Sequence, residues 1–183
     1  MMDVAHLNAT FPKYPITVSD KGWVYGVWYC PTAWMKTHFH GQYPLTFLKR
    51  CIALFPTATE WIHCPSGCVT GPGVTVDLII DEKRKPQLQA DAIALPFKDE
   101  MFQVYLSDPP YTHEDSAKYG CPPWKAKAAM DEARRILKSG GYYCLLNIRY
   151  PSFRPNDWLF KGIIGVATGA NRIARMLYIF QKP

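Results

Sequence analysis

Short apolar runs alternate along this chain with longer stretches in which apolar positions recur every three or four residues. The runs have the length of buried strands, whereas the periodic stretches are typical of amphipathic helices. Strands that alternate with helices favour an α/β fold with a mostly parallel central sheet. The predicted strands are residues 60–63, 74–80 and 101–106, and a run that follows Tyr142 and ends at Ile148.

Two periodic stretches predict helices that pack on this sheet. Residues 45–55 follow Pro44, which suits a first helical position, and the positions that fall on one face are Leu45, Leu48, Ile52 and Phe55. Residues 124–138 place alanines, a methionine and an isoleucine on one face, and the Ser-Gly-Gly sequence at 139–141 is expected to end that helix. Both segments therefore predict one buried and one solvated side.

Three other segments depart from a simple alternation. Residues 82–89 are too few for an ordinary parallel crossover, so one helix is expected to be trimmed or missing. Residues 162–166 and 172–180 flank a turn sequence and predict an antiparallel pair. Residues 1–40 are rich in aromatic side chains without clean periodicity and predict an irregular arm packed on the core, residues 41–183.

Length and composition limit what the chain can be. With 183 residues and 48% hydrophobic content, it can bury one sizeable core and is expected to form a single domain. A net charge of +6 is compatible with an anionic partner such as nucleic acid but does not identify one. The apolar stretch at 163–170 is far shorter than the roughly 20 residues that cross a bilayer, so no membrane span is expected.

Cysteine usage predicts a reduced, cytoplasmic protein. The six cysteines are scattered through predicted helix, strand and loop, and no signal peptide precedes them. His63, Cys64 and Cys68 could in principle bind zinc, but their spacing is not that of a structural zinc site, and no second pair of ligands follows. No metal is therefore expected.

The sequence with the clearest chemical content is Asp108, Pro109, Pro110 and Tyr111, just beyond the predicted strand 101–106. Two prolines stiffen the backbone and exclude helix, while the carboxylate and the aromatic ring form a rigid wall. Such a wall at the carboxyl end of a strand could hold a flat substrate that carries an amino group. An ordinary Asp-Pro-Pro turn beside an exposed tyrosine is the alternative interpretation.

This motif resembles that of the class I amino-methyltransferases that use S-adenosylmethionine and carry an Asp/Asn/Ser-Pro-Pro-Tyr/Phe/Trp sequence. The segments around it follow the same family, notably Asp-Ala-Ile-Ala-Leu-Pro-Phe at 91–97 and Glu-Ala-Arg-Arg-Ile-Leu-Lys-Ser-Gly-Gly-Tyr at 132–142. The resemblance implies a Rossmann-like fold whose sheet ends in an antiparallel pair. It also implies that Asp108, Pro109, Pro110 and Tyr111 form the catalytic motif.

The resemblance further implies where S-adenosylmethionine would bind. The turn that ends at Gly67 corresponds to the family's Asp-Pro-Phe-x-Gly-x-Gly, although His63 and Val69 replace the usual acid and second glycine. Asp77 is expected at the ribose hydroxyls, with Asp81 and Glu82 as rivals because the end of the strand is uncertain. The implied cofactor-binding residues are His40, Gln42, Cys64, Pro65, Ser66, Gly67, Asp77, Leu78, Asp91 and Ala92.

The implied reaction is methyl transfer to the exocyclic amino group of a nucleobase, with adenine in DNA favoured. At this length the chain leaves no room for a target-recognition domain, so specificity is expected to be low, supplied by a partner protein, or directed to a single strand. Small stand-alone enzymes of this type resemble those of phages. The alternatives are transfer to RNA, a free base or a protein amide, a noncatalytic cofactor or nucleic-acid binding module, and an enzyme that cleaves the cofactor.

Overall fold

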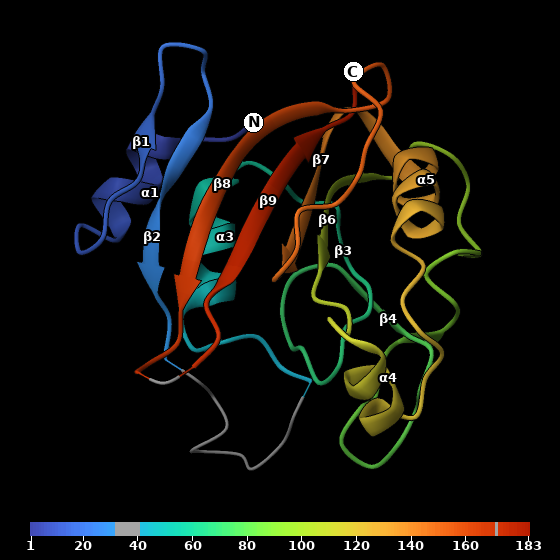
Figure 1. Ribbon diagram of the computed structural model, residues 1–183. Coiled ribbons are helices and arrows are strands. Elements are labelled where there is room, and N and C mark those ends of the chain that lie inside the picture. The colour runs from blue at the N-terminus through green and yellow to red at the C-terminus, as the bar shows by residue number, and fades with distance from the viewer. Residues whose placement is uncertain (32–40, 171) are drawn as a thin grey trace.

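One sheet forms the centre of the molecule (Figure 1). In the computed structural model, which describes residues 1–31, 41–170 and 172–183, nine strands pair in the order β1-β2-β8-β9-β7-β6-β3-β4-β5. The strands are β1 (Thr17–Val18), β2 (Val24–Tyr29), β3 (Trp61–His63), β4 (Val74–Asp77), β5 (Leu88–Gln89), β6 (Phe102–Ser107), β7 (Leu137–Asn147), β8 (Leu159–Ala167) and β9 (Arg175–Gln181).

Most neighbouring strands of this sheet are parallel. The strands β5, β4, β3, β6 and β7 run in one direction, and β9 lies antiparallel between β7 and β8. The predicted α/β class and the antiparallel C-terminal pair are therefore confirmed. Beyond that pair the sheet continues, because β2 pairs in parallel with β8 and β1 pairs antiparallel with β2.

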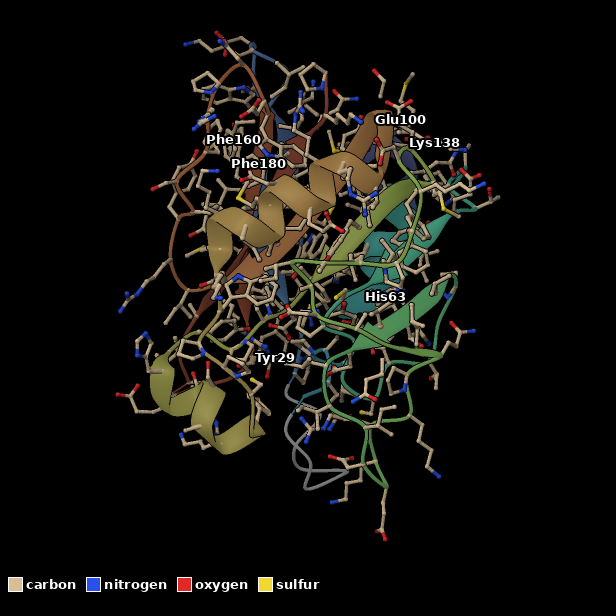
Figure 2. All side chains as sticks on the ribbon, turned by 90° about the vertical axis from the view of Figure 1, so that its right-hand side faces the viewer. Tyr29, His63, Glu100, Lys138, Phe160 and Phe180 are labelled. Carbon is tan, nitrogen blue, oxygen red and sulfur yellow. The ribbon has the colours of Figure 1, made fainter. Side chains whose placement is uncertain are left out.

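Helices cover the two faces of the sheet unequally. On one face α1 (Val4–Thr10) and α3 (Phe47–Leu54) bury a cluster that includes Trp28 of β2. On the other face α5 (Ala126–Ile136) packs against β6 and β7 (Figure 2), and Tyr143 is buried there. The short helix α4 (His113–Tyr119) follows β6 beside the carboxyl ends of the parallel strands. The two helices predicted from periodicity, α3 and α5, are thus present.

The N-terminal segment corrects the prediction of an irregular arm. Within residues 1–31 the chain forms α1, β1 and β2, while residues 32–40 lie outside the described part. In β2 the side chains of Val24 and Trp28 are buried, whereas Tyr25, Val27 and Tyr29 are exposed. The two-residue period of a strand was hidden because both of its faces carry apolar side chains.

The end of α5 also differs from the prediction. The helix expected over residues 124–138 ends earlier, because β7 follows it directly. The first residue of β7 pairs with Phe102, whereas Val104 pairs with Tyr142, so extra residues bulge from the ladder. Gly140 lies in this bulge with φ of 77°. The Ser-Gly-Gly sequence therefore shapes a bulge within the strand rather than stopping the helix.

The crossover between β4 and β5 is as short as the sequence predicted. The strand β4 ends at Asp77, earlier than expected, and residues 78–87 contain no helix. Among the described helices, none is long and apolar enough to span a membrane. The helix expected to be trimmed or missing in this crossover is absent from the described residues.

Candidate active site

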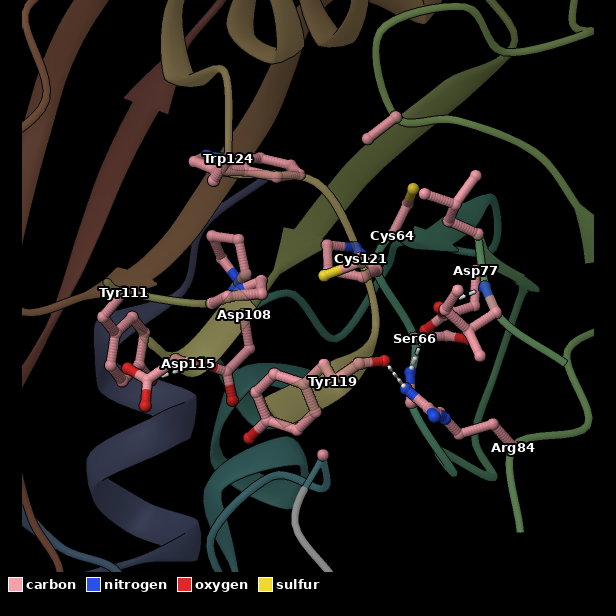
Figure 3. A pocket seen from close by; sticks show the side chains of 18 of the residues that line it. Cys64, Ser66, Asp77, Arg84, Asp108, Tyr111, Asp115, Tyr119, Cys121 and Trp124 are labelled. Atoms are coloured by element: carbon pink, nitrogen blue, oxygen red, sulfur yellow. Dashed lines mark hydrogen bonds between the residues drawn. The ribbon is translucent and has the colours of Figure 1, made fainter. Parts of the chain in front are cut away.

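The carboxyl ends of the parallel strands border a cavity of about 660 Å³ (Figure 3). This is the edge at which open α/β sheets bind ligands, and the volume is in the range of small-molecule sites. His40 lies outside the described residues, and the other predicted site residues all line the cavity. They are Gln42, Cys64, Pro65, Ser66, Gly67, Asp77, Leu78, Asp91, Ala92, Asp108, Pro109, Pro110 and Tyr111.

The turn after β3 brings the backbone unusually close to a neighbouring segment. Gly67 has φ of 54°, and a β-carbon built on it would lie 1.8 Å from the carbonyl oxygen of Gly41. The same carbonyl accepts a hydrogen bond from the backbone N–H of Cys68 at 3.1 Å. Glycine is therefore required at position 67 by both conformation and space.

A buried carboxylate fixes this turn to β4. Asp77 Oδ2 accepts the backbone N–H of Gly67 at 2.8 Å, and Oδ1 accepts that of Ile79 at 3.1 Å. The rival Asp81 is exposed and absent from the cavity wall, and the backbone and side chain of Arg84 lower its pKa to about 2. Glu82 is exposed too. Of the three acids, only Asp77 is in position to meet a ligand in the cavity.

Asp91 and Ala92 form a second part of the same wall, just after β5. Asp91 is exposed, and its Oδ1 accepts the backbone N–H of Ile93 at 3.2 Å. Such a turn holds the carboxylate at a fixed direction while its second oxygen stays available. The wall therefore carries two oriented carboxylates, Asp77 and Asp91.

Opposite this wall, Asp108 is held by two donors (Figure 3). The hydroxyl of Tyr111 donates to Asp108 Oδ1 in a short hydrogen bond. Arg175 Nη1 lies 3.5 Å from Asp108 Oδ2 and donates to the hydroxyl oxygen of Tyr111 at 3.1 Å. The carboxylate, the phenol and the guanidinium thus form a closed triad in the cavity wall.

Burial and charge act in opposite directions on this triad. The side chain of Asp108 is 14% exposed and that of Arg175 is 18% exposed. Burial raises the pKa of Asp108, while Arg175 and the hydrogen bond from Tyr111 lower it in part. Burial, and then the neighbouring carboxylate, raise the pKa of Tyr111 well above its ordinary value, so this phenol remains a donor. Arg175 offsets part of the cost of burying this carboxylate.

Arg175 belongs to the site although the sequence did not predict it there. It lies in β9, far along the chain from the motif, and counted only as one of many basic residues. No spacing rule connects it with Asp108, because their proximity depends on β9 pairing next to β7. Tyr119 and Trp124 also line the cavity without having been predicted there.

His63 occupies the position at which the resembling family has an acid, and it faces the core instead. Its side chain is buried, with Nε2 2.9 Å from the carbonyl oxygen of Pro72 and Nδ1 3.4 Å from the hydroxyl of Tyr43. Burial lowers its pKa, which favours the neutral ring. Among the described residues, no group of three or more His, Cys, Asp or Glu side chains is placed to bind a metal ion. All six cysteines are free thiols.

Comparisons with known proteins identify the fold. No family model and no curated protein sequence matches the chain. TrmN from Thermus thermophilus aligns over 74% of this chain and 48% of its own, with 17% identity and a TM-score of 0.50. The PH0226 protein from Pyrococcus horikoshii OT3 aligns over 75% and 88%, with 14% identity and a TM-score of 0.52. The chain thus spans about half the length of TrmN, and it has the Rossmann-like fold of class I methyltransferases.

Proposed function

We propose that this chain is a methyltransferase that uses S-adenosylmethionine and acts on the exocyclic amino group of a nucleobase, with adenine in DNA as the first choice. The observation that carries the proposal is the shared cavity. Asp77 and the turn at Gly67 line one side of it, and Asp108 lines the other. A donor and an acceptor bound on these two sides would meet over the carboxyl ends of β3 and β6.

The residues on the first side fit S-adenosylmethionine. Asp77 and Asp91 offer carboxylate oxygens, suited to the ribose hydroxyls and the adenine amino group respectively. The hydroxyl of Ser66, which is buried in this wall, has no hydrogen-bond partner among the described residues. Buried hydroxyls are normally satisfied, so a polar ligand in the cavity would complete this one. When bound, the cofactor would supply an electrophilic methyl group on a sulfonium.

On the second side, the role of Asp108 is to orient the acceptor. An aromatic amine is a poor nucleophile because its lone pair is delocalised into the ring. Asp108 and the carbonyl oxygen of Pro109 can each accept one amino hydrogen, which localises that lone pair and aims it at the methyl group. Pro109 and Pro110 hold this carbonyl rigidly, and the ring of Tyr111 can pack against the base. No covalent intermediate with the protein is required.

The triad suggests how the acceptor enters. Tyr111 donates to Asp108 Oδ1 and Arg175 to Oδ2, so an amino group that approaches Oδ1 competes with the hydrogen bond from Tyr111. Arg175 can remain, because each carboxylate oxygen accepts more than one hydrogen bond. Its positive charge favours the ionised Asp108 that the reaction needs. Arg175 is therefore proposed as a positioning residue.

The proposal is tested with purified protein and S-adenosylmethionine that carries a labelled methyl group. Unmethylated DNA oligonucleotides, single-stranded and duplex, should acquire label on adenine, and Asp108→Ala should abolish turnover while cofactor binding, measured by calorimetry, persists. Exposed Asp131→Ala, on α5, is the control for a lost carboxylate. Persistent absence of label from every DNA, with folded protein and bound cofactor, would reject DNA as the acceptor. The same assay with RNA of equal sequence tests the main alternative.

A noncatalytic binding module is the second candidate, and two observations favour it. The turn after β3 has lost the usual acid and second glycine, since His63 is buried and Val69 replaces the glycine. The carboxylate of Asp108 is already satisfied within the protein. Calorimetry separates the candidates, because such a module would show cofactor binding without turnover, or no cofactor binding at all.

A further inference from the structure

The strand β2 leaves a row of apolar side chains uncovered. Trp23, Tyr25, Val27 and Tyr29 are 44%, 48%, 57% and 43% exposed. Alternate residues of a strand point to the same side, so Tyr25, Val27 and Tyr29 share one face. Figure 1 shows α3 behind this part of the sheet and, within residues 1–31, 41–170 and 172–183, no helix in front of β2 and β8. We call this surface, Trp23 together with Tyr25, Val27 and Tyr29, the β2 aromatic face.

The neighbouring strand keeps these rings accessible. Tyr25, Val27 and Tyr29 pair with Ile163, Gly165 and Ala167 of β8. Two of the three β8 positions carry no side chain or only a methyl group, so little side-chain material rises beside Val27 and Tyr29. A β-carbon on Gly165 would lie 3.3 Å from a methyl group of Val27. The side chains of β8 therefore leave Val27 and Tyr29 exposed.

Further aromatic rings extend the face at both ends. Trp23 contacts Phe160 with ring centroids 5.7 Å apart, and Phe160 contacts Tyr150, which is 54% exposed, at 5.8 Å. At the other end Tyr14, itself 39% exposed, lies 6.2 Å from Tyr29. A run of accessible rings thus follows the whole length of β2.

Positive charges accompany these rings. Lys21 lies over the ring of Trp23, with Nζ 5.6 Å from the centroid, and Lys13 lies over Tyr14 at 5.4 Å. Arg149 is exposed next to Tyr150. Rings provide stacking surfaces for bases, and cations beside them provide contacts for phosphates. A polymer that carries planar apolar groups and a negative charge at regular intervals would match both features.

The face also leads toward the cavity. β2 runs parallel to β8, and Tyr29 pairs with Ala167 at the carboxyl end of both strands. The next residue, Thr168, lines the cavity that contains Asp108. A polymer that lies along β2 would therefore reach the rim of the candidate active site.

We propose that the β2 aromatic face binds a single strand of DNA and leads it to the cavity. The inference rests on the proposed function for the choice of DNA, but the surface itself is argued from its own residues. Single-stranded bases are free to stack on tyrosine and tryptophan, whereas the bases of a duplex stack on each other. A second protein copy is the competing occupant of an exposed apolar face. The lysines over Trp23 and Tyr14 favour an anionic occupant instead.

The test measures binding of a fluorescently labelled 12-mer DNA strand by anisotropy, without cofactor. Tyr25→Ala and Tyr29→Ala should each weaken binding about ten-fold, the usual effect of losing one stacked base. Ile80→Ala is the matched control, since Ile80 is 53% exposed in the β4–β5 crossover and does not line the cavity. It should leave binding unchanged. Thermal melting verifies that each variant is folded.

The outcomes separate this inference from the proposed function. Unchanged affinity in both tyrosine variants overturns the inference, whatever the catalytic result. The inference is also overturned if duplex DNA or RNA of the same sequence binds at least as tightly as single-stranded DNA. A further contrary result is a dimer, detected by sedimentation, that Tyr25→Ala and Tyr29→Ala dissociate. If the tyrosine variants lose DNA affinity but neither they nor the wild type bind S-adenosylmethionine, the DNA-binding role of the β2 aromatic face is supported and the proposed methyltransferase function is rejected.

Discussion

Replacing Arg175 by glutamine tests whether its charge keeps Asp108 ionised. The two groups are 3.5 Å apart and 18% and 14% exposed. Coulomb's law at an effective dielectric constant of about 20 gives about 5 kcal/mol for unit charges at this separation. Residual solvent screening reduces this value, and neighbouring opposite charges shift carboxyl pKa values by about 1–3 units in practice. Burial already raises the pKa of Asp108, so losing Arg175 raises it further.

The expected result is a shift in the pH dependence of methyl transfer. Ionised Asp108 accepts the amino hydrogens far better than the protonated acid does, so activity falls as pH drops through its pKa. In Arg175→Gln the acidic limb of kcat/KM should move about 1–3 units to higher pH, whereas Arg175→Lys, which keeps the charge, should move it less. Arg172→Gln, at the rim of the same cavity, is the matched control. An acidic limb unchanged in Arg175→Gln would refute the reasoning.

A second readout of the same variant does not depend on activity. A carboxyl group with a folded-state pKa above its unfolded value contributes stability at low pH, which is lost as pH rises through the folded-state pKa. For Arg175→Gln that pKa lies further above the unfolded value of about 3.9. Its free energy of unfolding, relative to wild type, should therefore decline as pH rises across this wider interval. Urea denaturation at a series of pH values measures the decline, and parallel curves for the two proteins would contradict the assigned role of Arg175.

Three further substitutions test two residues of the site, Gly67 and Tyr111, and one ion pair outside it, in which Arg135 of α5 donates hydrogen bonds to Glu132. Gly120→Ala should destabilise the fold by roughly 1 kcal/mol, because Gly120 has positive φ but open space around it. Gly67→Ala should destabilise it more, because the new β-carbon would also collide with Gly41. Chemical denaturation of the two variants measures the difference. Glu132→Gln should cost about 1–3 kcal/mol at neutral pH. The hydrogen bonds from its arginine partner lower the pKa of Glu132, so the stability that ionised Glu132 contributes is lost as pH falls through its folded-state pKa. The difference in unfolding free energy between wild type and Glu132→Gln should therefore be smaller at pH 3 than at pH 7, as measured by denaturation. Tyr111→Phe removes the hydroxyl that competes for the carboxylate, so KM for the acceptor should not rise; a large rise measured in the methyl-transfer assay would contradict the proposed displacement.

The parts of the fold that the sequence predicted are those with local periodic signals. α5 buries the predicted face of its periodic stretch, and β6 is a largely apolar run, so one-dimensional patterns were sufficient for both. α3 is present as predicted, but the face that it buries carries Phe47, Cys51 and Leu54, whereas Ile52 of the predicted face is exposed. β2 was missed because Tyr25 and Val27 are exposed although aromatic or apolar, which masks the alternation. The bulge at Gly140 was missed because Ser-Gly-Gly after a helix usually ends it. Both errors arise where tertiary pairing, rather than local preference, decides the conformation.

The candidate site divides in the same way. Asp77, Asp91 and Asp108 were expected at the site because their segments resemble those of methyltransferases. Each lies at or just beyond the carboxyl end of a strand, and parallel strands bring these ends to one edge. Arg175 was not recognisable, because its place depends on β9 inserting between β7 and β8. A basic residue on a late strand is an ordinary solvated residue until that pairing is known. The positive charge of Arg175 reaches the site through long-range strand pairing, whereas the three carboxylates could be predicted from local sequence.

Arg175 also changes how the motif itself is understood. A buried carboxylate without a partner would tend to take up a proton, and a protonated Asp108 would be a poor acceptor for an amino group. The ion pair from β9 favours ionised Asp108, and the hydrogen bond from Tyr111 satisfies it until a substrate arrives. The contacts that satisfy the carboxylate within the protein therefore also favour the ionised form that can accept an amino group. In the proposed reaction, an amino group exchanges with the hydroxyl of Tyr111 at Oδ1 while Arg175 keeps its contact with Oδ2.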